Sequence, residues 1–199
     1  MNLTILTLVI SQSAKFQLIN VPGRNDSGPK HWQSIWETDF AGVCRVSQLN
    51  WSSPTRDAWV HALDQTVQIQ SRPVILIAHS LGCNTIVHWA NTSENAAKCA
   101  GALLVAPGDV DMHASGGEIM TFVPTPLRRL PFVSTLVAST NDPLVAFERA
   151  QLFAMAWGST LVNVGAVGHV NAESNLGDWP QGKALLAQLI ESAQQHDEL

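Results

Sequence analysis

Short apolar runs recur along the chain and alternate with segments in which apolar residues return at helical spacing. The runs consist mainly of Val, Ile, Leu and Ala, the composition of strands that are buried on both faces of a sheet. This pattern predicts strands at residues 16–21, 43–49, 74–78, 101–105, 133–139 and 160–164.

Three of the intervening helices have recognisable N-termini. We place Ser53 at the N-cap and Pro54 at the first helical position of a helix that runs to Ile69, and we expect Pro143 and Pro180 to open two later helices. Proline suits the first turn because the amide hydrogen that it lacks has no partner there. Strands that alternate with helices predict an α/β protein whose mostly parallel sheet is covered by helices on both faces.

The chain of 199 residues contains no evident linker, repeat or low-complexity stretch, so we predict a single domain over residues 15–199. The apolar run at residues 3–10 has no Lys or Arg before it and is too short to span a bilayer. We interpret residues 1–14 as an extra edge strand or a loosely attached extension, and a secreted form as the less favoured alternative.

The charge and the cysteine content of the chain argue against several classes of binding partner. The net charge is −5, and basic residues are scattered singly apart from Arg128 and Arg129, so we expect neither nucleic acid nor a membrane as a partner. The three cysteines, Cys44, Cys83 and Cys99, are widely spaced and odd in number. That spacing predicts no disulfide framework and no zinc site, and reduced thiols favour a cytoplasmic protein. We expect no metal and no cofactor.

The third apolar run ends in Ala78-His79-Ser80-Leu81-Gly82, which is close to the nucleophile-elbow motif G-x-S-x-G. In that motif a serine sits in a strained turn between a strand and a helix, so its neighbours must be small. Gly82 meets this requirement, and Ala78 adds one methyl group to the strict pattern. The alternative is that Ser80 only caps the helix predicted from residue 83 to residue 90.

A serine nucleophile needs a general base and a carboxylate that orients the base. Asp142 and His169 follow the fifth and sixth predicted strands, and the carboxyl ends of parallel strands meet at one edge of the sheet. Ser80, Asp142 and His169 also occur in the chain order of α/β-hydrolase triads, so we predict them as nucleophile, orienting acid and base. Asp142 could instead cap a helix, His169 could be a loop residue, and Asp109 and Asp111 are rival acids.

Hydrolysis also needs donors for the oxyanion of the tetrahedral intermediate. We predict the backbone amide of Leu81 as one donor, because it follows the nucleophile. The second donor is assigned to the amide of Arg24 or of Asn25, since the turn at Pro22-Gly23 can leave either amide unpaired. The sequence does not choose between these two residues.

Substrate selection is assigned to the loops, whose apolar residues would suit short acyl or aryl esters. The candidates are Trp32, Met112, His113, Met120, Phe122 and Trp179. Trp32 has an alternative position in the core, because Trp36 lies four residues further along a predicted helix. We interpret His79 as a buried, hydrogen-bonded histidine rather than as a second base.

Several segments together resemble a family of small serine hydrolases typified by the retinoblastoma-binding serine hydrolase and its bacterial relatives. They are Val21-Pro22-Gly23, Ser27-Gly28-Pro29, His31-Trp32-Gln33, His79-Ser80-Leu81-Gly82, Asp142-Pro143, Gly168-His169-Val170-Asn171 and Glu173 to Pro180, in which Asn175 stands where a glycine is usual. The resemblance extends from about Lys15 to the C-terminus. It implies a compact α/β-hydrolase with little or no lid that acts on a small acyl substrate through a covalent acyl-enzyme.

The function predicted from these features is a serine hydrolase of carboxylesterase type, with thioesters and amides as related substrates. Two alternatives stay open. The chain could be a protein-interaction module that retains the hydrolase fold, or an acyltransferase that passes the acyl group to an acceptor other than water.

Overall fold

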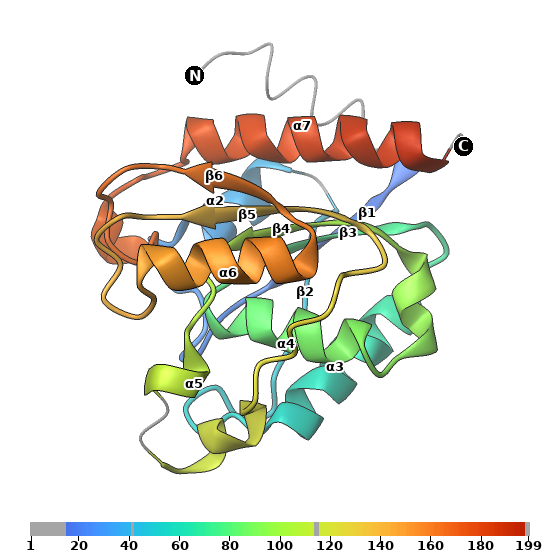
Figure 1. Cartoon of the computed structure of the whole chain (residues 1–199). Helices are drawn as coiled ribbons and strands as arrows, with labels where there is room; N and C mark the ends of the chain where they lie inside the picture. Colours follow the sequence, from blue (N-terminus) through green and yellow to red (C-terminus); the bar gives the residue numbers. More distant parts are fainter. Residues whose placement is uncertain (1–14, 41, 114–115, 198–199) are drawn as a thin grey trace.

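The computed structural model describes residues 15–40, 42–113 and 116–197 (Figure 1). Within these residues a six-stranded parallel sheet has the order β2-β1-β3-β4-β5-β6. The strands are β1 (Gln17–Val21), β2 (Cys44–Arg45), β3 (Val74–His79), β4 (Cys99–Val105), β5 (Val133–Ala138) and β6 (Thr160–Asn163). Each predicted run overlaps a strand, although β4 begins two residues earlier than predicted and β2 covers only two residues of the run at 43–49. The expectation for residues 1–14 lies outside the described residues.

Helices cover both faces of the sheet, as the alternating pattern predicted (Figure 1). One face carries α2 (Trp32–Asp39) and α7 (Pro180–Asp197), and the other carries α3 (Arg56–Gln68), α4 (Leu81–Ala90) and α6 (Phe147–Trp157). The remaining connections contain α5 (Val110–His113) and the 3₁₀ turns η2 (Glu94–Lys98), η3 (Glu118–Phe122) and η4 (Ala172–Ser174).

The central strand β3 explains why the apolar runs are continuous rather than alternating. All of its residues are buried. Ile75 and Ile77 pack into the layer formed with α2 and α7, whereas Leu76 and Ala78 pack into the layer formed with α3, α4 and α6. A parallel strand with helices on both sides buries both of its faces, so apolar residues predominate along its whole length.

The predicted start of α3 is wrong by two positions. Thr55 is the N-cap and the helix begins at Arg56, instead of at Pro54 after an N-cap at Ser53. The side chain of Asn50 accepts hydrogen bonds from the amides of Ser52 (3.1 Å) and Ser53 (2.9 Å). This local turn competes with the helix for the backbone donors of the segment.

The predicted start of α6 is also wrong, whereas that of α7 is confirmed at Pro180. The helix after β5 begins at Phe147 and not at Pro143. The amide of Leu144 donates to the carboxylate of Asp142 at 2.8 Å, so a turn forms directly after the strand.

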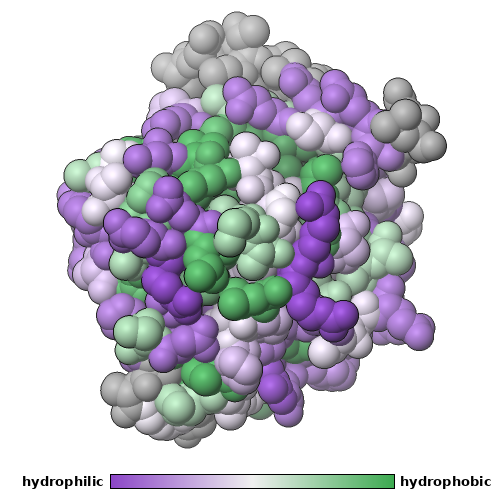
Figure 2. All heavy atoms as spheres, viewed as in Figure 1, coloured by the Kyte–Doolittle hydropathy of each residue, from purple (hydrophilic) through white to green (hydrophobic). Residues whose placement is uncertain are grey.

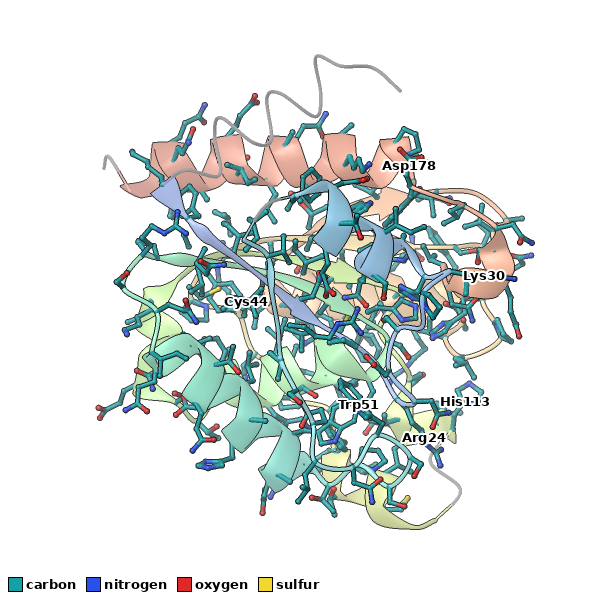
Figure 3. The ribbon with its side chains drawn as sticks, turned by 180° about the vertical axis from the view of Figure 1, so that it is seen from behind. Arg24, Lys30, Cys44, Trp51, His113 and Asp178 are labelled. Atoms are coloured by element: carbon teal, nitrogen blue, oxygen red, sulfur yellow. The ribbon has the colours of Figure 1, made fainter. Side chains whose placement is uncertain are left out.

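A buried lysine joins α7 to α2. Lys183 is 2% exposed, and its ammonium lies 2.6 Å from the carboxylate of Asp39 in α2. The same ammonium lies 3.1 Å from the carboxylate of Asp178, which Figure 3 shows at the start of α7. The two ion pairs compensate a charge that would otherwise be costly to bury.

The surface seen in Figure 2 is mixed. Hydrophilic residues frame a central group of hydrophobic residues over α6, where the side chain of Met155 is 80% exposed. In the described part of the chain, no helix combines the length and the apolar character needed to cross a membrane.

The end of β1 approaches the first turn of α4 so closely that only glycine fits. A Cβ atom at Gly82 would lie 2.1 Å from the carbonyl oxygen of Val21 and 2.8 Å from that of Pro22. Both contacts are with backbone atoms, which cannot rotate away as a side chain can. The strand and the helix would therefore have to separate to admit a methyl group.

We predict that Gly82→Ala destabilises the protein by about 3 kcal/mol or more, because overpacking against backbone forces the elements apart. The free energy of unfolding is measured by urea titration. Gly28→Ala is the matched control, since a Cβ atom there would meet nothing within 4 Å. Equal unfolding free energies for the two variants would contradict the prediction.

Candidate active site

Ser80 occupies a strained turn between β3 and α4. Its backbone dihedrals are φ 53° and ψ −123°, a region that residues with a side chain seldom adopt. Neighbouring strands and the helix hold it there, because its amide donates to the carbonyl of Val105 (3.0 Å) and its carbonyl accepts from the amide of Cys83 (2.9 Å). The side chain makes no capping hydrogen bond to α4, so the capping interpretation of Ser80 is wrong.

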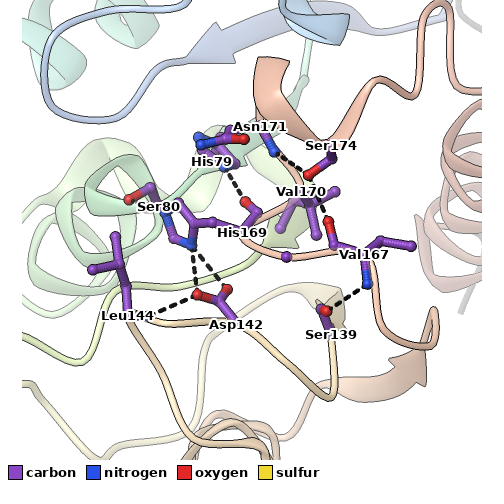
Figure 4. A network of polar contacts seen from close by, with 12 residues as sticks. His79, Ser80, Ser139, Asp142, Leu144, Val167, His169, Val170, Asn171 and Ser174 are labelled. Atoms are coloured by element: carbon purple, nitrogen blue, oxygen red, sulfur yellow. Dashed lines mark hydrogen bonds and ion pairs between the residues drawn. The ribbon is translucent and has the colours of Figure 1, made fainter.

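The hydroxyl of Ser80 instead contacts His169, and His169 contacts Asp142 (Figure 4). The Oγ of Ser80 lies 2.8 Å from Nε2 of His169, and Nδ1 of His169 lies 2.9 and 2.8 Å from the two oxygens of Asp142. The side chain of Asp142 is fully buried and that of His169 is 8% exposed. A neutral imidazole with its hydrogen on Nδ1 satisfies both contacts: it donates to the carboxylate and accepts the serine hydroxyl.

The rival acids are engaged elsewhere. Arg149 donates from Nε and Nη2 to the two oxygens of Asp109, at 2.7 and 3.0 Å, and from Nη2 to Asp111 at 3.2 Å. The hydrogen bond to Asp109 raises the pKa of Arg149. Asp109 and Asp111 therefore form a cluster with Arg149, and Asp142 is the carboxylate that contacts the imidazole.

The loop that carries His169 is held by side chains at the end of β5. The side-chain oxygen of Asn141 accepts the amide of Gly168 at 2.7 Å and the hydroxyl of Ser139 at 2.9 Å. The Oγ of Ser139 in turn accepts the amide of Val167 at 3.0 Å (Figure 4). Asn141 was not predicted, although its place beside Asp142 at the end of a strand was a usable signal.

From Gly168 to Asn175, two residues other than glycine take left-handed backbone conformations. Val170 has φ 49°, which is a strained value for a β-branched residue, and its carbonyl accepts the indole N–H of Trp32 at 2.8 Å. Asn175 has φ 51°. Asparagine tolerates this conformation better than most residues, which accounts for its presence where the resembling family has glycine.

The side chain of His79 holds the backbone of His169. Its Nε2 lies 2.9 Å from the backbone carbonyl of His169, to which it donates (Figure 4). Complete burial lowers the pKa of His79 well below its usual value, so the ring is neutral and its single N–H is used in this bond. The prediction of a buried, hydrogen-bonded histidine is confirmed.

The loop after β1 lies directly against the turn at Ser80. A Cβ atom at Gly23 would be 2.8 Å from the Cβ of Ser80 and 3.4 Å from the amide nitrogen of Leu81. The amide of Asn25 donates to the carbonyl of Trp51 at 2.9 Å, so it is not available to a ligand. Among the described residues no acceptor takes the amides of Leu81 and Arg24. Of the two alternatives for the second donor, Arg24 is the one whose amide is free.

A pocket of about 170 Å³ opens beside Ser80. Its walls come from the ends of β1 and β3, from α5 and η3, and from the turn after β5. It is lined by Arg24, Ser80, Leu81, Gly108, Asp109, Val110, His113, Ile119 and Leu144. Most of these lining residues lie in the irregular region after β4, which carries no periodic pattern; His113 and Asp109 were named there from the sequence, but Gly108, Val110 and Ile119 were not.

Of the candidate substrate residues on α5 and η3, only His113 lines the pocket. Val110 and His113 are three residues apart and share one side of the short helix α5, whereas Met112 points away and is 72% exposed. Met120 is 44% exposed, and Phe122 is fully buried in a cluster with Trp59 and Leu81. The predictions for Met112, Met120 and Phe122 as pocket residues are wrong.

Trp32 and Trp179 are core residues rather than pocket residues. They are 1% and 3% exposed, and their ring centroids lie 5.0 Å apart in the layer between the sheet, α2 and α7. Trp36 stacks on Trp179 with centroids 5.9 Å apart, and its indole donates to the carbonyl of Asp178 at 2.8 Å. Aromatic packing on this face of the sheet therefore explains both tryptophans.

Among the described residues, no group of three or more His, Cys, Asp or Glu side chains is arranged so that it could bind a metal ion. The cysteines Cys44, Cys83 and Cys99 are free thiols. Burial raises the pKa of Cys83 and of Cys99, so both remain protonated.

The geometry agrees with a comparison to family models. Residues 18–188 match the model described as "Serine hydrolase". The chain belongs to the serine hydrolase family. None of the curated proteins matches it significantly.

Solved structures of this family and fold are similar to the chain. A YdeN-like hydrolase from Pectobacterium atrosepticum is 35% identical, with a TM-score of 0.85, over 96% of this chain and 98% of that one. The ydeN gene product of Bacillus subtilis is 17% identical, with a TM-score of 0.63, and the match covers 90% of this chain and 99% of that one. A monoacylglycerol lipase from Paleococcus ferrophilus is 12% identical, with a TM-score of 0.63, and the match covers 90% of this chain and 94% of that one. The second and third matches support the α/β-hydrolase fold alone.

Behind this serine hydrolase site, His31 is a buried histidine at the start of α2. Its Nδ1 accepts the amide of Gln33 at 3.2 Å, and its Nε2 is buried without a hydrogen-bond partner. Burial, with a smaller effect of the nearby Arg45 charge, lowers the pKa of His31 to about 4 from 6.5. The folded state therefore binds fewer protons than the unfolded chain between these two pH values.

We predict that stability falls as the pH decreases from about 6.5 to about 4, and that His31 contributes up to about 3 kcal/mol of this loss. His31→Asn should make the decline shallower, because asparagine can also cap a helix but does not titrate. Urea unfolding at closely spaced pH values measures the effect. Parallel curves for wild type and variant would contradict it.

Proposed function

We propose that this serine hydrolase is of carboxylesterase type and cleaves a small ester through an acyl-enzyme on Ser80. The observation that carries the proposal is the continuous hydrogen-bonded path from Ser80 through His169 to Asp142. A hydroxyl with an imidazole acceptor at 2.8 Å, itself oriented by a buried carboxylate, has the arrangement that nucleophilic catalysis requires.

Each group has a defined step. His169 accepts the proton of Ser80 as the hydroxyl oxygen attacks the ester carbonyl, and Asp142 stabilises the imidazolium that forms. The amides of Leu81 and Arg24 donate to the oxyanion, and each donor is worth about 3 kcal/mol in the transition state. The imidazolium then protonates the leaving alkoxide. In the second half, His169 activates a water molecule that releases the acid and restores Ser80.

The pocket favours short substrates. A cavity of about 170 Å³ is below the size of typical drug-binding pockets, and apolar side chains of Leu81, Val110, Ile119 and Leu144 form much of its lining. Structural neighbours that include a monoacylglycerol lipase and an esterase domain from Rhodothermus marinus are consistent with ester substrates. Acyl transfer would pass through the same acyl-enzyme, and product analysis with added alcohols separates it from hydrolysis.

We predict that a fluorophosphonate probe labels wild-type protein and that Ser80→Ala abolishes both the labelling and the hydrolysis of short-chain esters. The probe reacts only with an activated serine hydroxyl. Labelling is measured by intact-protein mass spectrometry. Ser192→Ala, which removes an exposed serine of α7, should label as wild type does. Persistent labelling of the Ser80 variant would refute the proposal.

We predict that Asp142→Asn lowers kcat by about 10⁴ with a much smaller change in KM, because the amide can no longer hold the required tautomer of His169. Steady-state kinetics on a short-chain ester measure the effect. Asp57→Asn makes the same chemical change at an exposed carboxylate and should keep wild-type kcat. A loss of less than tenfold in the Asp142 variant would exclude its assigned role.

A further inference from the structure

The side chain of Arg24 lines the pocket next to Ser80 with most of its hydrogen-bonding capacity unused. Its Nε donates to the carbonyl of Ser52 at 3.1 Å, which anchors the guanidinium. No carboxylate among the described residues forms an ion pair with it. Its two terminal nitrogens donate to no group among the described residues and remain a pair of charged donors.

Three described carboxylates of this region already have partners. Asp109, which lines the same pocket, is bound by two nitrogens of Arg149. Asp26, two residues after Arg24, lies 2.6 Å from Nη1 of Arg45. Asp142 is bound to His169. Among the described residues Arg24 therefore forms no ion pair, in a protein whose net charge is −5.

The position of this charge relative to the pocket limits what it can bind. Figure 3 shows Arg24 and His113 on the same side of the molecule, and both line the pocket with Ser80. The same pocket is also lined by the apolar side chains of Leu81, Val110 and Ile119. An occupant that reaches Ser80 with an apolar part can therefore present an anionic group to the guanidinium.

We propose that Arg24 selects esters that carry a carboxylate a few bonds from the scissile carbonyl. The inference rests on the proposed function and names its substrate class. A guanidinium fixed at Nε offers its terminal nitrogens to both oxygens of a carboxylate, a geometry that a neutral substituent of the same size cannot use. The backbone amide of Arg24 would donate to the oxyanion, and its guanidinium would form an ion pair with the carboxylate of the substrate.

The test compares esters that match in length and differ in charge. Monoethyl succinate and ethyl pentanoate carry a carboxylate or an ethyl group at the same position on the acyl side. Acetoxyacetate and propyl acetate do so on the alcohol side. Hydrolysis is followed by proton release in a pH-stat. The measured quantity is the ratio of kcat/KM for the charged ester to that for the neutral ester, so any general effect on catalysis cancels.

We predict that wild type prefers the charged ester in at least one pair and that Arg24→Gln lowers this ratio by about tenfold. Arg24→Lys, which keeps the charge and loses the paired donors, should give an intermediate ratio. Raising the salt concentration should reduce the wild-type preference, since the guanidinium is exposed. Arg128→Gln removes an exposed arginine that does not line the pocket and should keep the wild-type ratio.

A second measurement does not depend on turnover. The charged esters should slow the labelling of Ser80 by a fluorophosphonate more than the neutral esters do, and Arg24→Gln should remove the difference. If Ser80 is labelled but neither the ratio nor the protection depends on Arg24, the inference fails and the proposed hydrolase function stands. If Ser80 is not labelled at all, the proposed function fails first.

Discussion

The site depends on the close approach between the end of β1 and the first turn of α4. Because Gly82 has no side chain, the carbonyls of Val21 and Pro22 can lie against the helix. The same contact places the loop at Gly23 against Ser80. One packing constraint therefore sets both the strained turn that presents the hydroxyl and the position of the amides proposed to face the oxyanion.

The opposite side of the site is held by polar contacts from three separate elements. His79 at the end of β3, Trp32 in α2 and Asn141 after β5 each donate to or accept from the backbone around His169. These bonds satisfy backbone groups that would be costly to bury unpaired. They also fix the imidazole between Ser80 and Asp142, so the loop itself needs no regular secondary structure.

Charge at the site is distributed unevenly. Burial keeps His31 and His79 neutral, and the carboxylates of Asp109 and Asp142 have partners, whereas no carboxylate among the described residues pairs with the guanidinium of Arg24. The neutral histidines support the fold behind the nucleophile, and the guanidinium lines the pocket beside it. The same residue thus provides a backbone donor for the proposed chemistry and a side-chain charge for the proposed selection.

Local patterns were enough to determine the strands, the fold class and the three residues that meet at the site. Each strand overlaps a predicted apolar run, although β2 has only two residues, and Ser80, Asp142 and His169 follow strands whose ends must share one edge of a parallel sheet. Local patterns could not choose between Arg24 and Asn25, place the starts of α3 and α6, or find the pocket lining. Those features depend on contacts between distant segments, such as the bond from Asn25 to Trp51, and only the folded chain brings such partners together.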